Sequence, residues 1–338
     1  MLTSQQIANY CHALGFEIVG FSHCLIDDEY LLKIEKQYFN HKLLIRKNLP
    51  YQDYINVAKV VSNPQLIISV GLSYHQKNIS TTKKMIGHFS KASYGQDYHQ
   101  LIYAKLDEIV NYLKKEKADL EYFYSCDTKI LDDRYFAYLC GNGFYGKNSM
   151  IINEKYGSEV FYGTIVCDLE VNFEQPQLIE SKCGTCQLCE LSCPTNSLNN
   201  YELDYKSCLA YLTQSRELFK PQLINSVIYG CDICNNICPF NDDVKDTAAF
   251  KEQIGYLDLC EVIVLSKNDY HQQFNDKSFS WLNHNIMKKN AILALQPYLK
   301  TNYDDIYQLY RKVEQQMTSP LIKEAFEYIL KDDYFDEI

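Results

Sequence analysis

Cysteine spacing constrains the fold of this chain more than any other feature. Eight of its fourteen cysteines lie between residues 183 and 238. A first run has three cysteines at two-residue gaps and ends in Cys193-Pro194. A second run has one cysteine fewer and ends in Cys238-Pro239, and Cys208 lies alone between the two runs. Three thiolates at two-residue gaps followed by a cysteine before proline are typical of proteins that bind two iron–sulfur clusters.

In two-cluster ferredoxins the cysteine before proline binds the other cluster, so we expect the two runs to share ligands. The expected cluster-1 cysteines are Cys183, Cys186, Cys189 and Cys238. The expected cluster-2 cysteines are Cys193, Cys208, Cys231 and Cys234, with Cys208 filling the place that the second run lacks. The chain is therefore predicted to carry electrons through two [4Fe–4S] clusters.

Other uses of these cysteines fit less well. Structural zinc favours separate pairs of cysteines and needs no Cys-Pro ending. Disulfides are not expected, because the N-terminus lacks the charged and apolar regions of a secretory signal and a cytoplasmic location is predicted. The remaining six cysteines are expected to be small buried apolar residues: Cys11, Cys24, Cys126, Cys140, Cys167 and Cys260.

Length and composition limit the classes of protein to which this chain can belong. With 338 residues and 46% hydrophobic content, two or three globular domains are expected. No apolar stretch approaches the length of a membrane span, so no membrane partner is predicted. The net charge of −10 argues against a protein that coats nucleic acid without specificity, although a local basic patch remains open.

Apolar periodicity predicts helices and strands in mixed order ahead of the cysteines. Helices are expected at 4–15, 27–47, 102–113 and 132–139, and strands at 16–21, 66–74, 121–126 and 158–171. Because these elements do not alternate strictly, we expect an α+β fold. The expected domains are an α+β domain at 1–178, a ferredoxin-like domain with both clusters at 179–243, and a short α-helical, HEAT-like repeat region at 244–338.

Several short motifs precede the cysteines in a fixed order. They are Ala92-Ser-Tyr-Gly-Gln-Asp-Tyr-His99, Asp127-Thr-Lys-Ile-Leu-Asp-Asp-Arg134, Gly141-Asn-Gly-Phe-Tyr-Gly-Lys-Asn-Ser-Met-Ile-Ile152 and Tyr156-Gly-Ser158. With the cysteine pattern and Cys208-Leu-Ala-Tyr-Leu-Thr-Gln-Ser215, this order resembles the epoxyqueuosine reductase family. The resemblance runs from about residue 5 to Asn290-Ala-Ile-Leu-Ala-Leu295, which is most of the chain.

The resemblance implies an enzyme that removes the epoxide oxygen of epoxyqueuosine at the wobble position of tRNA. It implies cobalamin in the N-terminal α+β domain, two [4Fe–4S] clusters that feed it electrons, and a monomer. The implied partners are the tRNA anticodon loop and an external electron donor. The resemblance also places cobalamin contacts at Lys147, Asn148, Ser149, Ile151, Tyr162, Ala210, Asp232 and Ile233.

Asp127 matches the proton donor of the family. Opening an epoxide requires a strong nucleophile, which reduced cobalamin supplies, and a proton for the departing oxygen. An aspartic acid in water titrates near 4, so a site of low polarity must raise its pKa. A turn or helix-capping role for Asp127 stays open, although Asp132 and Asp133 fit capping better.

Two other motifs resemble cofactor-binding motifs, but the sequence around them does not favour that role. Gly141, Gly143 and Gly146 have the spacing of a dinucleotide loop, but they follow a helical segment instead of a strand. They are expected either to approach a flat macrocycle closely or to form a structural turn. His99 lacks the glycine that follows a cobalt-binding histidine, so it is expected to pack or hydrogen-bond at a helix start.

Basic residues that contact tRNA are expected after Cys208 and in the C-terminal helices, at Arg216, Lys220, Lys288 and Lys289. Ordinary solvated helix faces would explain these residues too.

Two alternative functions stay open. One is a cobalamin-dependent reductase of small molecules, similar to a dehalogenase. The other is a cluster-bearing electron carrier without catalysis, which would not need so large a domain ahead of its clusters.

Overall fold

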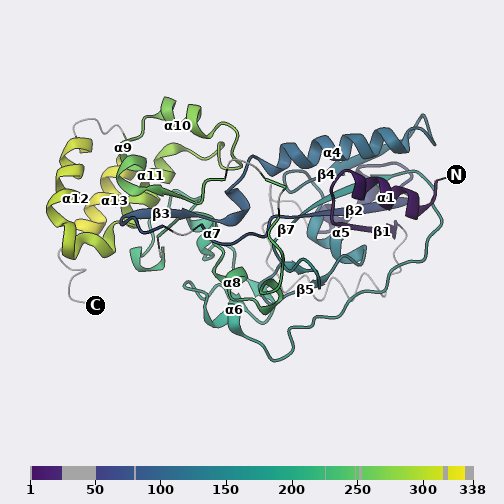
Figure 1. Cartoon of the computed structure of the whole chain (residues 1–338), viewed down its shortest axis with the longest axis horizontal. Coiled ribbons are helices and arrows are strands. Elements are labelled where there is room, and N and C mark those ends of the chain that lie inside the picture. The colour runs from purple at the N-terminus through teal and green to yellow at the C-terminus, as the bar shows by residue number, and fades with distance from the viewer. Residues whose placement is uncertain are drawn as a thin grey trace.

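The computed structural model describes residues 2–24, 51–79, 81–224, 226–247, 249–250, 253–314 and 319–331. The N-terminal region and the C-terminal helices lie at opposite ends of an elongated molecule, and the cysteine-rich segment lies between and below them (Figure 1). The helix expected at 27–47 lies outside the described residues.

A four-stranded antiparallel sheet forms the N-terminal body. Its order is β1 (Ile18–His23), β2 (Leu66–Ser73), β7 (Val160–Cys167) and β4 (Tyr122–Ser125). Every residue of β2 is buried, which explains its continuous apolar sequence. β1, β2 and β4 begin and end within two residues of their predicted ranges. β7 begins two residues later and ends four residues earlier than its predicted range, 158–171.

Helices cover both faces of this sheet. Along β2, Ile68 belongs to the core that contains α1 (Ser4–Ala13) and α4 (Tyr98–Leu113), while Ile67 belongs to the core that contains α5 (Asp133–Leu139). This alternation follows from the two-residue period of a strand. The N-terminus of α1 is fixed by a capping box formed by Thr3 and Gln6. The mixed helix and sheet content confirms the expected α+β class.

A second sheet joins distant parts of the chain. β3 (Ile86–Phe89) pairs in parallel with β10 (Val227–Tyr229) and antiparallel with β11 (Tyr256–Asp258). The core beneath it combines residues from all three expected regions: Phe89, Leu209, Ile228, Phe279 and Phe326 are among its members. The C-terminal helices therefore share one core with the segments that flank the cysteines.

The remaining elements are short or C-terminal. They are α3 (Tyr51–Ile55), the hairpin β5 (Phe144–Tyr145) and β6 (Ile151–Ile152), α6 (Leu188–Leu191), the pair β8 (Leu198–Asn199) and β9 (Glu202–Leu203), α7 (Leu209–Leu212), α8 (Ile233–Asn236), α9 (Leu259–Val264), α10 (Lys267–Phe274), α11 (His284–Leu293), α12 (Leu299–Glu314) and α13 (Pro320–Leu330). Within the described ranges, no helix is both long enough and apolar enough to cross a membrane.

Candidate functional site

The clustered cysteines fall into two spatial groups. The four expected cluster-1 cysteines all line one cavity of about 230 Å³, beside Lys147 and Leu188. In the other group, burial raises the pKa of Cys231 to about 12, and the nearby thiols of Cys208 and Cys193 add to the rise. Burial also raises the pKa of Cys234, again with contributions from Cys231 and Cys208. The grouping agrees with the crossed assignment made from the sequence.

The chemistry of these two groups suits iron–sulfur clusters. A [4Fe–4S] cluster is held by four cysteine thiolates, and each group offers four. Among the described residues, no group of three or more His, Cys, Asp or Glu converges tightly enough to hold a single ion. A wider spacing is expected where each cysteine binds a different iron of one cluster.

Side chains of the N-terminal body hold the cluster-1 loop. The Lys147 ammonium donates hydrogen bonds to the carbonyl oxygens of Gly184, at 3.0 Å, and of Cys186, at 2.9 Å. The amide of Asn148 donates to Oδ1 of Asn235, on α8, at 3.1 Å. The polar groups of Lys147 and Asn148 are therefore used to fix the cysteine-rich segment.

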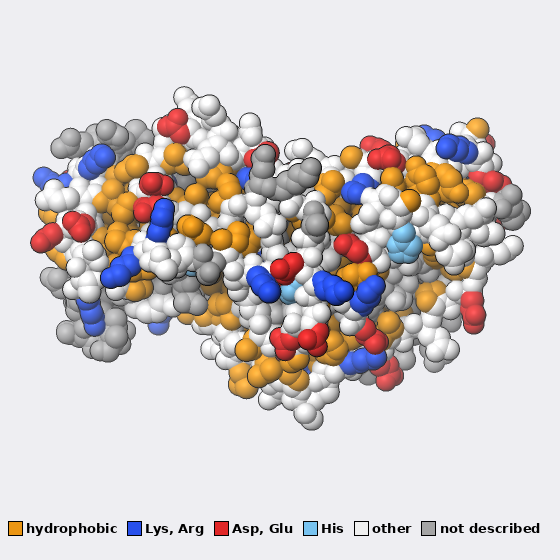
Figure 2. Space-filling view, in the orientation of Figure 1, with side chains coloured by type: hydrophobic (Ala, Val, Ile, Leu, Met, Phe, Trp, Pro, Cys, Tyr) orange, Lys and Arg blue, Asp and Glu red, His pale blue; other side chains and the backbone are white. Residues whose placement is uncertain are grey.

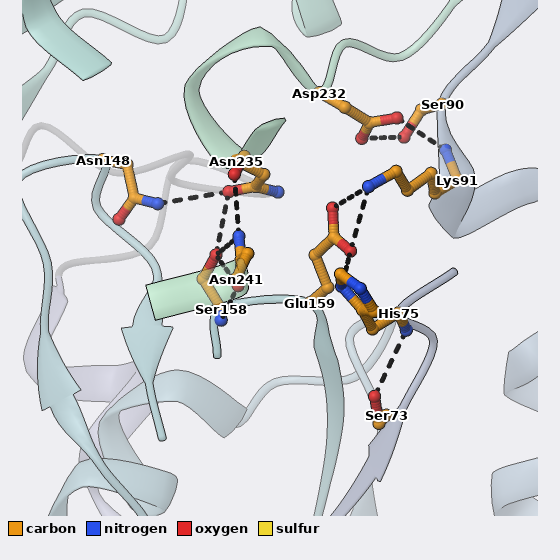
Figure 3. A network of polar contacts seen from close by, with 10 residues as sticks. All are labelled: Ser73, His75, Ser90, Lys91, Asn148, Ser158, Glu159, Asp232, Asn235 and Asn241. Atoms are coloured by element: carbon orange, nitrogen blue, oxygen red, sulfur yellow. Dashed lines mark hydrogen bonds and ion pairs between the residues drawn. The ribbon is translucent and has the colours of Figure 1, made fainter. Parts of the chain in front are cut away.

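A buried polar network joins the cluster-2 segment to the N-terminal body (Figure 3). The Asp232 carboxylate accepts hydrogen bonds from Ser90 Oγ and from the backbone N–H of Lys91, both at 2.7 Å. The Lys91 ammonium lies 2.9 Å from Glu159, which also lies 2.6 Å from His75 Nδ1. Glu159 is fully buried, and the Lys91 ammonium compensates its charge. The network fixes the position of cluster 2 against the first sheet.

Asp127 lies at the end of β4 in a constrained conformation. Its φ of +56° is in the left-handed region, which is uncommon for a residue with a side chain. Its backbone N–H donates to Oδ2 of Asp133 at 2.6 Å. Burial raises the pKa of Asp133 to about 7. Asp132 caps α5 as predicted, whereas Asp133 instead holds the backbone of Asp127.

The Asp127 carboxylate meets residues from the start of α4. Tyr98 Oη donates to Oδ2 of Asp127 at 2.7 Å, and His99 Nε2 lies 3.5 Å from the same oxygen. His99 Nδ1 lies 2.7 Å from Oδ1 of Asp97, the N-cap of α4. His99 thus hydrogen-bonds at a helix start, as predicted, and it also lies between two carboxylates.

The two carboxylates control the charge of His99. Burial alone would lower the pKa of His99, but the contacts with Asp127 and Asp97 outweigh it and raise that pKa to about 9. The imidazole is therefore protonated at neutral pH. The arrangement is a carboxylate with a charged proton carrier beside it, and the Asp127 side chain is 49% exposed.

Tyr229 connects this carboxyl site to the cluster-2 cysteines. It ends β10, two residues before Cys231. Burial raises the pKa of Tyr229 to about 12, and the negative charges of Asp127 and Asp97 add to the rise, so both carboxylates are within electrostatic reach of the Tyr229 hydroxyl. The Tyr229 ring packs against Phe279 with ring centres 5.3 Å apart. The candidate acid and the cluster-2 segment therefore flank the same region.

Comparison with known proteins identifies the family. Residues 55–128 match the family described as epoxyqueuosine reductase QueG, DUF1730, and residues 182–241 match the 4Fe-4S double cluster binding domain. An epoxyqueuosine reductase of Bacillus anthracis is 30% identical over 313 residues, which cover 86% of this chain and 79% of that protein. The chain belongs to the epoxyqueuosine reductase family. This is a family of oxidoreductases.

Solved structures of the family have the same fold. The epoxyqueuosine reductase of Streptococcus thermophilus matches with a TM-score of 0.84 at 25% identity, over 99% of this chain and 93% of that one. An epoxyqueuosine reductase bound to an epoxyqueuosine-modified tRNA-Tyr stem loop also has a TM-score of 0.84 at 25% identity, over 98% of this chain and 91% of that one.

The expected cobalamin contacts of this reductase do not form one surface. The side chains of Ile151 and Tyr162 are buried in the core beneath α5. Ser149 is buried with a φ of +59°, and Ala210 is half-buried on α7. Contacts through the Ile151 and Tyr162 side chains would require that core to open, so a role for these two residues through their side chains stays a prediction.

Asp232 and Ile233 are placed differently. They line a cavity of about 210 Å³ together with residues of and near β3, including His88 and Tyr94. Ligand pockets usually have volumes of about 300–1,000 Å³. Because this cavity is smaller, it has room for only an edge of a large cofactor. It lies directly beside the cluster-2 segment.

The glycine loop of this reductase serves the β5–β6 hairpin. A Cβ at Gly143 would lie 2.4 Å from the carbonyl oxygen of Ile152, and one at Gly146 would lie 2.4 Å from the Ile152 side chain. Gly141 has a φ of +72° just after α5. Of the two alternatives left open by the sequence, the structural turn is the one that these contacts favour.

The prediction that Lys289 contacts tRNA is wrong. Lys289 is fully buried in α11, and its ammonium donates to the carbonyl oxygens of Leu212, Ser215 and Glu217 at 3.0–3.1 Å. It also lies 4.8 Å from the ring centre of Phe219. Burial lowers the pKa of Lys289 to about 7. Its donors are used inside the protein.

Neighbouring α11 residues complete this contact, which we call the α11 clasp: Lys289 and Asn290 with the carbonyl groups that they bind. Asn290 Nδ2 donates to the carbonyl oxygens of Thr213, at 2.7 Å, and Ile228, at 2.8 Å. These carbonyls lie just after Cys208 and just before Cys231. The clasp therefore holds the two segments that carry cluster-2 cysteines.

The other predicted tRNA residues remain accessible. Arg216 and Lys220 are exposed in the segment after α7, and Lys288 is half-buried on α11. On the face shown in Figure 2, basic and acidic side chains are interspersed. Sequence reasoning missed Asp97 and Tyr98 as site residues, because only the fold brings the start of α4 to Asp127.

Proposed function

We propose that this chain reduces the epoxide of epoxyqueuosine at the wobble position of tRNA, with cobalamin and two [4Fe–4S] clusters as its cofactors. The observation that carries the proposal is that the candidate acid and the cluster-2 segment meet at the same end of β7. Tyr98, which holds Asp127, stacks on Phe161 of β7 with ring centres 3.7 Å apart. Glu159, just before β7, forms an ion pair with Lys91, whose backbone N–H holds Asp232 beside Cys231. A proton source and an electron source thus face one region. The family assignment supplies the substrate.

The reaction needs both sources. Both carbon–oxygen bonds of the epoxide break, a carbon–carbon double bond forms, and the oxygen leaves as water. The balance requires two electrons and two protons. The electrons come from an external donor through the clusters, and at least one proton must reach the departing oxygen.

Asp127 is the proposed proton donor. Its half-exposed carboxyl faces the region beside Tyr229, and the left-handed backbone held by Asp133 fixes its direction. His99, protonated and 3.5 Å away, is placed to return a proton to Asp127 after each turnover. Tyr98 holds the reacting oxygen of Asp127 by a hydrogen bond of 2.7 Å. General acids of this kind typically contribute about 10²–10⁴-fold to the rate.

The clusters are proposed to be bound by the cluster-1 and cluster-2 cysteines, each with four thiolates. Cluster 2 is the nearer to Asp127, so electrons pass from cluster 1 to cluster 2. Three exposed apolar side chains border the cluster-1 cysteines: Leu188, Leu191 and Ile237, at 43%, 80% and 42% exposure. Figure 2 shows hydrophobic side chains at the lower edge of the molecule, in the region of α6 and α8. The proposed occupant of this apolar edge is a small carrier protein with an exposed one-electron cofactor.

Cobalamin, when bound, would supply the strong two-electron nucleophile that single-electron clusters lack. The residues present fit an edge of such a group, because Asp232 and Ile233 line a cavity beside the cluster-2 segment. The Asp232 carboxylate is held in place there by Ser90 and Lys91.

The substrate region is proposed to lie over the C-terminal helices, with Arg216, Lys220 and Lys288 contacting phosphates. A monomer and a cytoplasmic location belong to the same proposal, since the substrate is a tRNA. The three-part layout, with an α+β domain at 1–178, a cluster domain at 179–243 and helices at 244–338, is proposed as a functional division of one packed body.

The direct test is nucleoside analysis of tRNA. Protein reconstituted with iron, sulfide and cobalamin is incubated with epoxyqueuosine-containing tRNA and a strong reductant, and queuosine is the expected product. Loss of the product when cobalamin alone is omitted would support the cofactor assignment. A protein that loads both clusters and cobalamin yet leaves epoxyqueuosine unchanged would overturn the proposal.

A further inference from the structure

Trp281 is the single tryptophan of the chain, and 64% of its side chain is exposed. Isolated exposed apolar residues are common on protein surfaces, so exposure alone indicates nothing. Its position and its support are what distinguish Trp281.

The turn between α10 and α11 holds Trp281 rigidly. Its neighbours Phe279 and Leu282 are buried, at 0% and 1% exposure. Phe279 stacks on Phe89 with ring centres 4.8 Å apart, and Tyr270 Oη donates to the Phe279 carbonyl oxygen at 3.2 Å. A ring fixed in this way loses little conformational entropy when it binds a ligand.

The same turn is attached to the candidate active site. The backbone N–H of Asp97 donates to the carbonyl oxygen of Asp276 at 2.7 Å. Phe279, two residues before Trp281, packs against Tyr229 with ring centres 5.3 Å apart. The turn that carries Trp281 therefore contacts both the start of α4, which holds Asp127, and the end of β10, which precedes Cys231.

Lysines lie on both helices that flank this position. Lys267 begins α10 and Lys288 lies on α11, and both act electrostatically on His284 at the start of α11. An exposed indole between two helices that carry lysines offers a flat apolar face together with partners for phosphate.

We propose that the Trp281 indole stacks on a nucleobase of the anticodon loop adjacent to the modified nucleotide, while the cations of α10 and α11 hold the neighbouring phosphates. The proposal rests on the proposed function and names a contact for its substrate. Aromatic platforms suit unpaired bases because every base has a π face, and single-stranded loops are the usual target of specific RNA recognition. The modified base itself would pass Trp281 to reach Asp127.

The single tryptophan permits a direct test. Holoprotein is titrated with an unmodified anticodon stem-loop RNA, and tryptophan fluorescence is followed. Stacking is expected to quench the emission of Trp281. A blunt RNA duplex of equal length and charge, which binds through phosphates alone, is expected to leave the emission unchanged.

Variants separate stacking from charge. Trp281→Ala is expected to raise the Kd for the stem loop roughly 5- to 100-fold, measured by anisotropy of labelled RNA, and to leave the Kd for the duplex unchanged. Trp281→Phe should recover most of the affinity. Tyr303→Ala, which removes a 42% exposed aromatic ring on α12, is the matched control and should alter neither Kd. Iron content and cofactor spectra should remain those of the wild type.

The outcomes separate this inference from the proposed function. Unquenched emission at saturation, or an unchanged Kd in Trp281→Ala, overturns the stacking proposal. If the wild-type holoprotein still forms queuosine in that case, the proposed function stands. If it neither forms queuosine nor binds the stem loop, the proposed function fails and the stacking proposal fails with it.

Discussion

Replacing Lys289 by methionine is expected to loosen the cluster-2 cysteines, whereas the same change at the adjacent Lys288 is not. Methionine keeps the length of the buried side chain but cannot donate hydrogen bonds. The carbonyl oxygens of Leu212, Ser215 and Glu217 would lose their donor inside the protein. Lys288 is only half-buried.

The magnitude follows from the α11 clasp. A buried group left without its partner costs about 1–3 kcal/mol, and three carbonyls are affected. The lower value, about 1 kcal/mol for each group, applies to carbonyl oxygens because each has a second lone pair. The buried apolar surface of the methionine side chain offsets part of this destabilisation. The net destabilisation is about 2 kcal/mol, which corresponds to a fall in Tm of roughly 3 °C for a chain of 338 residues.

The assay compares two variants, Lys289→Met and Lys288→Met. Thermal unfolding is followed by circular dichroism, and iron is counted per chain after reconstitution. Lys289→Met should show the lower Tm and lose iron from cluster 2 first, because the clasp holds the segments beside Cys208 and Cys231. Equal Tm values and equal iron in the two variants would refute this account of the clasp.

Four further predictions concern the reaction. Asp127→Asn should bind cobalamin and tRNA but lose turnover by about 10²-fold or more, and wild-type rates in single-turnover assays would contradict its role as the acid. Cys208→Ala should lose the iron and the spectrum of one cluster, whereas Cys260→Ala, outside the motifs, should keep both; eight irons retained in the first variant would exclude Cys208 as a ligand. The contacts with Asp127 and Asp97 raise the pKa of His99 to about 9. Protonated His99 therefore stabilises the site fully below pH 6.5, its ordinary pKa, and this contribution is lost as the pH rises through about 9. Turnover of the wild type should fall between pH 6.5 and 9, and a fall of the same size in His99→Gln would disprove the assignment. Leu191→Glu should slow cluster reduction by a reduced flavodoxin in stopped-flow absorbance but not reduction by dithionite, and equal rates with flavodoxin would place electron entry elsewhere.

Local patterns in the sequence predicted the parts of the site that are themselves local. The cysteine runs, the strands at 66–73 and 160–167, and the cap at Asp132 each depend on spacing within a few residues. The grouping of the eight cysteines also agrees with the expected sharing. The position of Asp127 was expected from its motif, but its contacts with Tyr98 and His99 were not. These residues are almost thirty positions away in sequence and approach only because α4 packs on the sheet beside β4.

The error at Lys289 has a physical cause. In sequence, Lys288 and Lys289 form a basic pair of the kind found on solvated helix faces. In the fold, α11 is buried on most sides, with Ile286, Met287 and Ala291 all in the core. A buried lysine is stable there only because loop carbonyls from a distant segment surround its ammonium, and no local pattern encodes those carbonyls. The pairing of β3 with β10 and β11 was missed for the same reason, since each strand has only three or four residues.

The sheet β10–β3–β11 affects how this protein can change in evolution or be recombined. Its central strand comes from the N-terminal half, and its two edges come from segments more than 130 residues later. An exchange of the C-terminal helices between relatives, cut near residue 243, would bring in a foreign β11 and a foreign α11 against a resident β3 and β10. Such chimeras should fold only when both parents have compatible residues along β3. The region proposed to face the RNA is therefore inherited together with the segments proposed to carry the electrons, and it cannot diversify as a separate module.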